Sequence, residues 1–246
     1  MNVGDRINYI SNWIAKYSKS NSEKNFELVI GISGGIDSAV TSSLCANTGI
    51  NTHVVSMPIK QNIKQHDLSL KHINWLKNKY NNILDYVIEL DYVFKVFEKT
   101  MNSFNSELAF ANSRSRLRMV TLYQIAQSKE ALVVGTGNKV EDFGIGFYTK
   151  YGDGGVDLSP IADCTKSEVW EMGKHLGIDE EIIEAKPTDG LWDDSRNDED
   201  QIGLTYQQIE EAMKNNKSKY FKKYISIRES NLHKMKPIPV CKFRNE

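Results

Sequence analysis

Four short apolar runs divide the first 140 residues of the chain. They are FELVIGIS (26–33), THVVSMPI (52–59), DYVIEL (85–90) and ALVVGTG (131–137). Each is rich in aliphatic and β-branched residues and shows little polar alternation, which is typical of strands covered on both faces. The four runs therefore predict a buried sheet.

Segments with helical periodicity separate these runs. They cover residues 37–47, ended by a glycine at 49, and then 66–80, 92–104 and 113–128. Strands that alternate with helices in this order predict a doubly wound, mostly parallel α/β sheet with helices on both faces. The first residues, MNVGDRINYISNW, read as an amphipathic helix before the first strand.

The pattern changes after residue 135. The stretch DFGIGFYTKYGDGGVD (142–157) contains five glycines and predicts a long loop. A helix restarts after it, because Thr165 and Glu168 have capping-box spacing. The acidic run DDSRNDED (193–200) predicts a mobile surface segment, and two closing helices are expected on either side of KNNKSKYFKKY (214–224).

Composition excludes several classes of protein. The 246 residues are 40% hydrophobic and 26% charged, with a formal net charge of −1, so nothing favours a nucleic acid partner. A solvated helix face explains KNNKSKYFKKY better than RNA binding does, because an acidic run lies nearby. No apolar run approaches the roughly 20 residues of a membrane span. Cys45, Cys164 and Cys241 are scattered, so we expect a cytoplasmic protein without disulfides or structural zinc.

The clearest chemistry lies in VIGISGGIDSAV (29–40), where a strand run passes into a helix. Adjacent glycines let an anion approach backbone N–H groups at a helix N-terminus, and Ser33 and Ser38 add hydroxyl donors. Asp37 would repel a phosphate unless a cation lay between them, so the string predicts a magnesium-complexed pyrophosphate. The string lacks the lysine of GxxxxGK[ST] and the spacing of GxGxxG. The plain alternative is a tight turn with Asp37 in the first helical turn.

The string SGGIDS resembles the pyrophosphate loop of the ATP pyrophosphatases, which belong to the adenine-nucleotide alpha-hydrolase superfamily. Three further strings resemble the ammonia-dependent NAD synthetases: GTGNKVEDFGIGFYTKYGDGGVDLSPIADCTKSEV (135–169), KPTDGLW (186–192) and DEDQIGLTY (198–206). The resemblance implies an ATP- and Mg²⁺-dependent ligase. Such an enzyme adenylates the nicotinate carboxylate of deamido-NAD, and ammonia then displaces AMP to give NAD. It also implies a homodimer and a single NAD synthetase domain over 1–246.

The resemblance also assigns roles to individual residues. Asp37 and Glu141 match the magnesium ligands, and Asp153 matches a residue that binds ammonium and removes its proton. Lys166 matches a residue that contacts ATP and stabilises the leaving pyrophosphate. The other matched ATP contacts are Gly31, Ile32, Ser33, Gly34, Gly35, Ile36, Asp37, Ser38, Thr136 and Thr188. The matched contacts to deamido-NAD are Arg116, Lys150, Asp157, His233 and Lys234.

Spacing constrains one of these assignments. Arg114 and Arg118 would share one face of a helix, and Arg116 would point almost oppositely. Only one side of that trio can serve the substrate, and the resemblance selects Arg116.

The chain departs from the family pattern between the ATP contacts. Related sequences carry GTDHAAE where this chain has GTGNKVE, so the roles of Gly137 and Asn138 stay open. The segment from Glu141 to Lys150 is one residue longer than in some relatives.

Segments that the sequence lacks limit the choice of nitrogen donor. No glutaminase domain is expected, so free ammonia is the predicted donor, and the CxxC of tRNA-thiolating enzymes is missing. Two alternatives remain: another adenylating ammonia ligase of the superfamily, and a nucleotide-binding module without catalysis.

Overall fold

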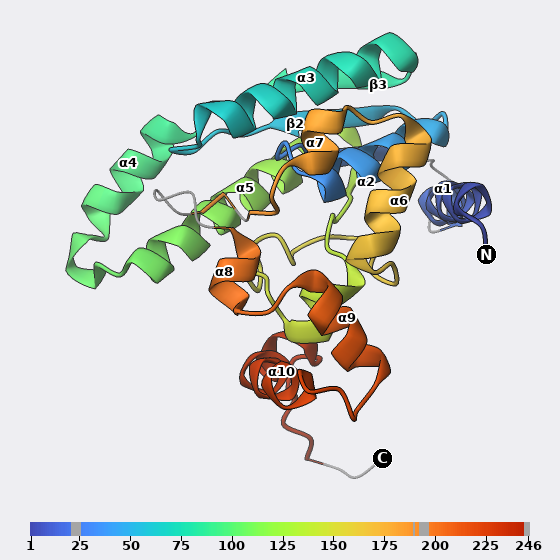
Figure 1. Cartoon of the computed structure of the whole chain (residues 1–246). Helices are drawn as coiled ribbons and strands as arrows, with labels where there is room; N and C mark the ends of the chain where they lie inside the picture. Colours follow the sequence, from blue (N-terminus) through green and yellow to red (C-terminus); the bar gives the residue numbers. More distant parts are fainter. Residues whose placement is uncertain (21–25, 189, 192–196, 244–246) are drawn as a thin grey trace.

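A parallel sheet lies in the upper part of the molecule as drawn in Figure 1, above the C-terminal helices. The computed structural model describes residues 1–20, 26–188, 190–191 and 197–243. The strands are β1 (Glu27–Gly31), β2 (Thr52–Ser56), β3 (Ile83–Val87) and β4 (Ala131–Val133), in the order β3-β2-β1-β4 and all parallel. The predicted doubly wound sheet is confirmed, although each strand is shorter than its apolar run. The edge strand β3 also begins two residues before its run, and it is not buried on both faces as predicted, because only β2 pairs with it.

Side chains of the central strands alternate between two apolar cores. In β1, Leu28 and Ile30 belong to one core and Val29 to the other, and Val54 and Val55 of β2 divide in the same way. Successive side chains of a strand point to opposite faces, so a strand buried on both faces reads as an unbroken apolar run. The strand prediction succeeded for this reason.

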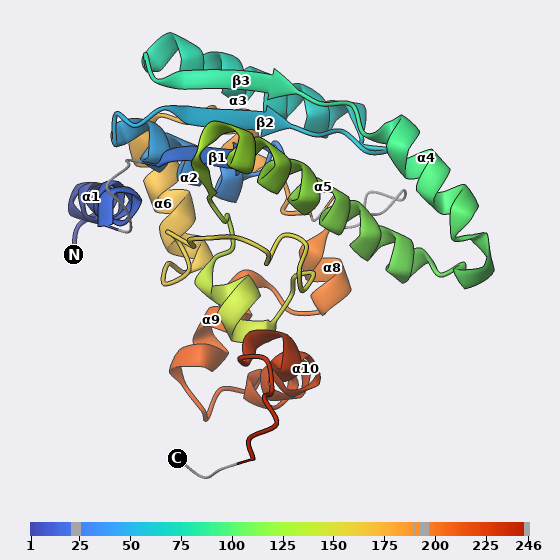
Figure 2. The same cartoon turned by 180° about the vertical axis from the view of Figure 1, so that it is seen from behind.

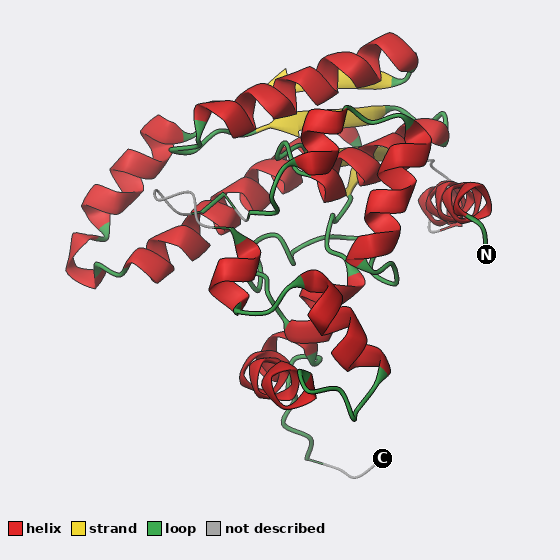
Figure 3. Ribbon diagram, viewed as in Figure 1, coloured by secondary structure: helices red, strands yellow, loops and turns green. Residues whose placement is uncertain are grey.

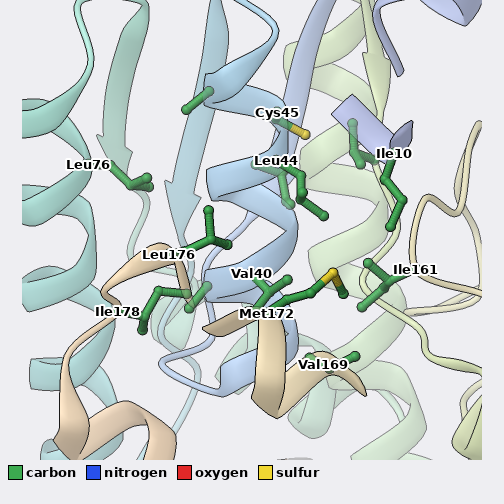
Figure 4. Close-up of a cluster of buried hydrophobic side chains, with 14 of the residues drawn as sticks. Ile10, Val40, Leu44, Cys45, Leu76, Ile161, Val169, Met172, Leu176 and Ile178 are labelled. Atoms are coloured by element: carbon green, nitrogen blue, oxygen red, sulfur yellow. The ribbon is translucent and has the colours of Figure 1, made fainter. Parts of the chain in front are cut away.

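Helices cover both faces (Figures 1 and 2). The first core, shown in Figure 4, packs the sheet against α1 (Val3–Ser20), α2 (Ile36–Asn47), α3 (Ile63–Lys79), α6 (Lys166–Leu176) and α7 (Glu180–Glu184). The second core packs it against α4 (Asp91–Thr100) and α5 (Glu107–Lys129), which a 3₁₀ turn at Asn102–Phe104 helps to connect. No helix among the described residues is both long and apolar enough to cross a membrane.

The C-terminal helices form a separate layer (Figure 3), and a third apolar cluster lies within it. It joins α8 (Asp198–Ile202), α9 (Tyr206–Lys214) and α10 (Phe221–Met235) to a π-helical turn, η2 (Lys139–Ile145). The two predicted closing helices are α9 and α10. This layer matters for function, because η2 carries the predicted metal ligand Glu141.

Three expectations were incomplete or wrong. α5 begins six residues earlier than predicted, because the Ser106 side chain accepts a hydrogen bond from the Ala109 N–H and caps it. The predicted loop over 142–157 begins inside η2, since Asn138 Oδ1 accepts from two backbone N–H groups and starts a helical turn there. Of the predicted acidic surface segment, residues 193–196 lie outside the described residues and Asp198 is buried.

A buried histidine under the sheet predicts acid sensitivity. His72 is buried on α3, where its Nε2 lies 2.9 Å from Ser42 Oγ, and burial lowers its pKa from 6.5 to about 4. As pH falls below 6.5 the unfolded chain binds a proton that the folded chain excludes, so stability is lost. We expect the free energy of unfolding to fall by about 2 kcal/mol between pH 7 and pH 5 through this group.

Urea unfolding of wild type and His72→Leu at both pH values checks this. The substitution should flatten the pH dependence, whereas His175→Gln, at an exposed position, should leave it unchanged. An equal loss in wild type and His72→Leu would contradict the prediction.

Candidate active site

A tight turn between β1 and α2 forms the predicted phosphate loop. Gly34 has a φ of +88°, and a Cβ there would come within 2.4 Å of the Gln65 carbonyl oxygen, so only glycine fits. The Oγ atoms of Ser33 and Ser38 lie 3.1 Å apart, and Ser38 also donates to the carbonyl of Gly35 at 2.9 Å. The turn presents bare backbone and two hydroxyls at the N-terminus of α2, a suitable environment for an anion.

A pocket of about 510 Å³ extends from this turn. Its walls include residues from the segment after β2, from α5, from the segment between β4 and η2, and from α6 and α8. It lies beyond the carboxyl end of β1, which pairs with β2 on one side and β4 on the other. Ligands of open parallel sheets bind at such switch points. The volume suits a small molecule.

The predicted ATP contacts all line this pocket. They are Gly31, Ile32, Ser33, Gly34, Gly35, Ile36, Asp37, Ser38, Thr136, Lys166 and Thr188. The first eight come from one turn, whereas the others arrive from segments far along the chain. The fold therefore brings this predicted set together around one space.

Lys166 links the two predicted metal ligands at the side of the pocket. Its Nζ lies 2.5 Å from Asp37 Oδ2 and 2.8 Å from Glu141 Oε1, and its side chain is buried. Asn138 Nδ2 donates to the other oxygen of Asp37 at 3.0 Å. Asp37 comes from the first turn of α2 and Glu141 from η2, so the two carboxylates share one cation supplied by α6.

Residues of the C-terminal layer complete this cluster. The Tyr206 hydroxyl lies 2.5 Å from Glu141 Oε1, to which it donates, and 3.1 Å from Asp198 Oδ2. The Lys166 ammonium also lies 4.8 Å from the centre of the Tyr206 ring. Burial, together with the carboxylates of Glu141 and Asp198, raises the pKa of Tyr206, so the phenol stays protonated and orients Glu141.

The charges in this cluster are out of balance. Burial works to lower the pKa of Lys166, but the charges of Asp37 and Glu141 outweigh it and raise that pKa. Burial opposes ionisation of Glu141, yet the Lys166 charge and hydrogen bonds from Lys166 and Tyr206 leave its pKa lowered. The pKa of Asp37 is raised, because burial and the Glu141 charge exceed the effect of Lys166. One ammonium does not fully compensate the two carboxylates, which are only partly exposed to water.

Two carboxylates that converge on one cation fit a divalent metal. Mg²⁺ is usually bound by one or two carboxylates, with water and phosphate oxygens as its other ligands. In the described part of the chain no cluster of three or more His, Cys, Asp or Glu side chains could hold a metal. Asp37 and Glu141 would therefore need further oxygen ligands to complete the predicted metal site.

Asp153 sits in a constrained turn that lines the pocket. Its Oδ1 accepts from the Ser115 hydroxyl at 2.8 Å and from the Thr149 N–H at 2.9 Å, and its own N–H donates to Ser115 Oγ at 2.9 Å. A second acid, Asp142, lines the same pocket. Burial and the charges of Asp153 and Glu141 raise the pKa of Asp142 well above its usual value.

The predicted deamido-NAD contacts lie outside the residues that line this pocket. Arg116 is exposed and its Nε donates to the Lys150 carbonyl at 3.3 Å, and Lys150 Nζ donates to the His233 carbonyl at 3.2 Å. Lys234 Nζ donates to the Tyr148 carbonyl at 2.9 Å. Four of the five predicted residues thus lie where the 148–150 segment meets α10.

The fifth residue stands apart. Asp157 accepts from the Tyr123 hydroxyl at 2.9 Å and from the Val133 N–H at 2.8 Å, beside β4. As helical spacing predicts, Arg118 faces inward and donates to the Met57 carbonyl, and Arg116 is on the outside of α5.

Four site residues had no assigned role in the sequence: Tyr206, Asp198, Asn138 and Asp142. Tyr206 and Asp198 are the two ends of DEDQIGLTY, which was singled out only by resemblance. Nothing local indicates that a tyrosine hydroxyl would reach a carboxylate of a distant turn. Lys166, by its local pattern alone, reads as an ordinary surface lysine, yet it is buried.

Comparisons with known proteins match most of the chain to one family. The sequence model of the NAD synthase family matches residues 6–244. An NH₃-dependent NAD⁺ synthetase from Archaeoglobus fulgidus is 37% identical over 165 residues, which are 65% of this chain and 66% of that protein. Among the first of these curated relatives, the matched segments span from 53% to 66% of the relative's length.

Solved structures are similar over greater lengths. An NMN synthetase from Francisella tularensis has a TM-score of 0.89 and 32% identity, covering 99% of this chain and 100% of that chain. An NH₃-dependent NAD synthetase from Campylobacter jejuni has a TM-score of 0.78 and 25% identity, covering 98% of this chain and 100% of that chain.

Proposed function

The chain belongs to the NAD synthase family, and on that premise we propose that it is an ammonia-dependent ligase that amidates a nicotinate nucleotide. The reaction would consume ATP and release AMP and pyrophosphate. The observation that carries the proposal is the cluster of Asp37, Glu141 and Lys166 beside the phosphate loop. A passive nucleotide-binding module has no need of two partly buried carboxylates that share a buried lysine.

The first step is adenylation of the substrate carboxylate. The pyrophosphate part of ATP would bind the turn of Ser33 to Ser38, and Lys166 would stabilise the charge that develops on the leaving pyrophosphate. A carboxylate oxygen attacks the α-phosphorus and the bond to the β-phosphate breaks. Mg²⁺ held by Asp37 and Glu141 would neutralise phosphate charge when bound.

The second step forms the amide. Ammonia attacks the carbonyl carbon of the adenylate, the bond to AMP breaks, and the nitrogen that entered as ammonium gives up two protons in all. Asp153 faces the pocket from a turn braced by Ser115 and Thr149. We propose that this carboxylate attracts the ammonium and accepts a proton, which leaves the neutral amine free to attack.

Two substrates are candidates. Deamido-NAD follows from the resemblance and from the names of the curated relatives, so NAD is the first proposed product. The Francisella structure, which matches this chain over nearly its whole length, is named for nicotinamide mononucleotide. Nicotinate mononucleotide is therefore the second candidate, because it is the acid that amidation would convert into that product.

A coupled assay tests the proposal. Purified protein is incubated with ATP, Mg²⁺, ammonium and one acid at a time: deamido-NAD, nicotinate mononucleotide, or a panel of other carboxylic acids. Pyrophosphate and AMP released only with deamido-NAD or nicotinate mononucleotide, in equal amounts with the amide, support the ligase and identify its substrate. Release with another acid supports a different adenylating ligase. No release with any acid supports the binding module.

A variant of Asp153 separates the two steps. Asp153→Asn should still exchange labelled pyrophosphate into ATP at nearly the wild-type rate, because the phosphate loop is untouched. Amide formation should fall by about tenfold to a hundredfold, since the ammonium loses a charged partner. Equal loss of both activities would remove Asp153 from the ammonia step.

We also propose a homodimer in a cytoplasmic setting. Exposed apolar side chains gather along α4 and α5: Tyr92, Val93, Val96, Phe97, Leu108 and Val120. Such a surface suits a partner with the same surface, as in a two-fold dimer. Sedimentation equilibrium of the purified protein measures the assembly state directly.

A further inference from the structure

Gly137 and Asp142 occupy one another's space in the pocket wall. A Cβ built on Gly137 would lie 1.9 Å from Asp142 Oδ2 and 2.3 Å from Asp142 Cγ. Non-bonded atoms do not approach that closely, so the Asp142 carboxylate fills the volume in which a side chain at position 137 would begin. The absence of a Cβ at position 137 is a condition for Asp142 to stand there.

The η2 turn places Asp142 in this position. The Asp142 N–H donates to the Asn138 carbonyl at 3.1 Å, and Asn138 itself caps the turn. Gly137, Asp142 and Glu141 all line the pocket. The side chain therefore folds back over Gly137, toward the space where the substrate is expected.

The surroundings of Asp142 favour a cation. Among the described residues its carboxylate makes no hydrogen bond, and the partly buried side chain lines the pocket. The carboxylates of Asp153, Glu141 and Asp37 act on it, and Lys234 is the opposing charge. The Lys234 ammonium, however, donates to a backbone carbonyl of the neighbouring loop, that of Tyr148. A small cation that entered between Asp142 and Asp153 would meet two negative groups.

We propose that Asp142 is a further catalytic residue, whose carboxylate binds the ammonium nitrogen donor from the space that a residue-137 side chain would otherwise fill. The proposal rests on the proposed ligase function. Asp153 contributes the second negative charge, while its bonds to Ser115 and Thr149 set the shape of the turn. Asp142 is the acid that makes no hydrogen bond among the described residues, and a cation bound beside it favours its ionised form.

A charge-removing variant with the same volume tests the role in binding. Asp142→Asn should raise the KM for ammonium by about tenfold to a hundredfold. The KM values for ATP and for the acid substrate should stay within about twofold of wild type, and so should pyrophosphate exchange. Asp163→Ala is the matched control, because that exposed carboxylate pairs with Lys139 at the start of the same turn. It should change none of these values.

A pair of substitutions tests the shared volume. Gly137→Asp alone should lose most activity and lower the melting temperature, because two side chains would compete for one space. Gly137→Asp combined with Asp142→Ala should recover at least about tenfold of the ammonium-dependent rate lost in Gly137→Asp. Recovery would mean that a carboxylate at position 137 can bind ammonium in place of Asp142.

The outcomes separate this proposal from the ligase function itself. An ammonium KM within twofold of wild type in Asp142→Asn overturns the binding role. If the double variant has the same ammonium-dependent rate as Gly137→Asp, the claim that a carboxylate at position 137 can replace Asp142 is overturned. If wild type forms no amide from either nicotinate nucleotide, the proposed function has failed and this proposal fails with it. Should the double variant not fold, Asp142→Asn alone decides.

Discussion

Replacing Asp37 by alanine is expected to abolish pyrophosphate release, with a loss of at least about a thousandfold in the rate of adenylation. Asp37 is one of the two carboxylates that converge on the Lys166 ammonium, and it stands in the first turn after the phosphate loop. Without it, Glu141 is the one predicted metal ligand left. Lys166 would also turn wholly toward Glu141 and away from the leaving group.

Isotope exchange between labelled pyrophosphate and ATP, in the presence of the acid substrate, measures this step alone. Asp37→Asn is the matched control for shape, because it keeps an acceptor for Asn138 but removes the charge. We expect Asp37→Asn to lower the exchange rate nearly as much as Asp37→Ala. The melting temperature of each variant reports whether its fold is intact. Normal turnover in Asp37→Ala would falsify the proposed mechanism from its first step.

Lys166→Met should cause the second large change, in both stability and activity. Removing one partner of a buried charge group leaves the others uncompensated, which costs about 3–5 kcal/mol of stability. Here Asp37 and Glu141 would face each other without the ammonium that they share. A divalent cation should then relieve their repulsion, so Mg²⁺ should raise the melting temperature of the variant more than that of wild type.

Calorimetry with and without Mg²⁺, in the absence of nucleotide, measures this effect without reference to catalysis. Lys139→Met is a suitable control, because its ammonium pairs with Asp163, whose side chain is 97% exposed. Such surface pairs contribute about 0–1 kcal/mol. An equal response to Mg²⁺ in wild type and Lys166→Met would show that the ammonium and the metal do not compete for one position. Adenylation by Lys166→Met should also fall, by about a hundredfold or more.

Much of the fold could be predicted because its signals are local. Leu28, Val29 and Ile30 are apolar in succession since they serve two cores, and this reads directly as a buried strand. The start of α5 was missed because its cap, Ser106, precedes a turn with no apolar periodicity. The beginning of the glycine-rich segment was read as loop, although Asn138 caps a helical turn there.

In the candidate site, too, residues with a local sequence signal could be predicted, and residues placed by distant contacts could not. Asp37 could be predicted because its neighbours in the chain, two glycines and two serines, make the anion site around it. Lys166 could not be predicted from its surroundings in the sequence, because only the packing of α6 against α2 places its ammonium between Asp37 and Glu141. Contacts between residues so far apart leave no trace in local periodicity.

The hydrogen bond from Tyr206 to Glu141 makes the orientation of a predicted metal ligand depend on packing in the C-terminal layer. Tyr206 begins α9 and is held by the apolar cluster of the C-terminal layer. An altered side chain in that cluster could turn the Glu141 oxygen away from a nucleotide without replacing any group that the nucleotide touches. Inactivating substitutions should therefore map to two regions, the lining of the pocket and the apolar cluster of the C-terminal layer that supports Glu141.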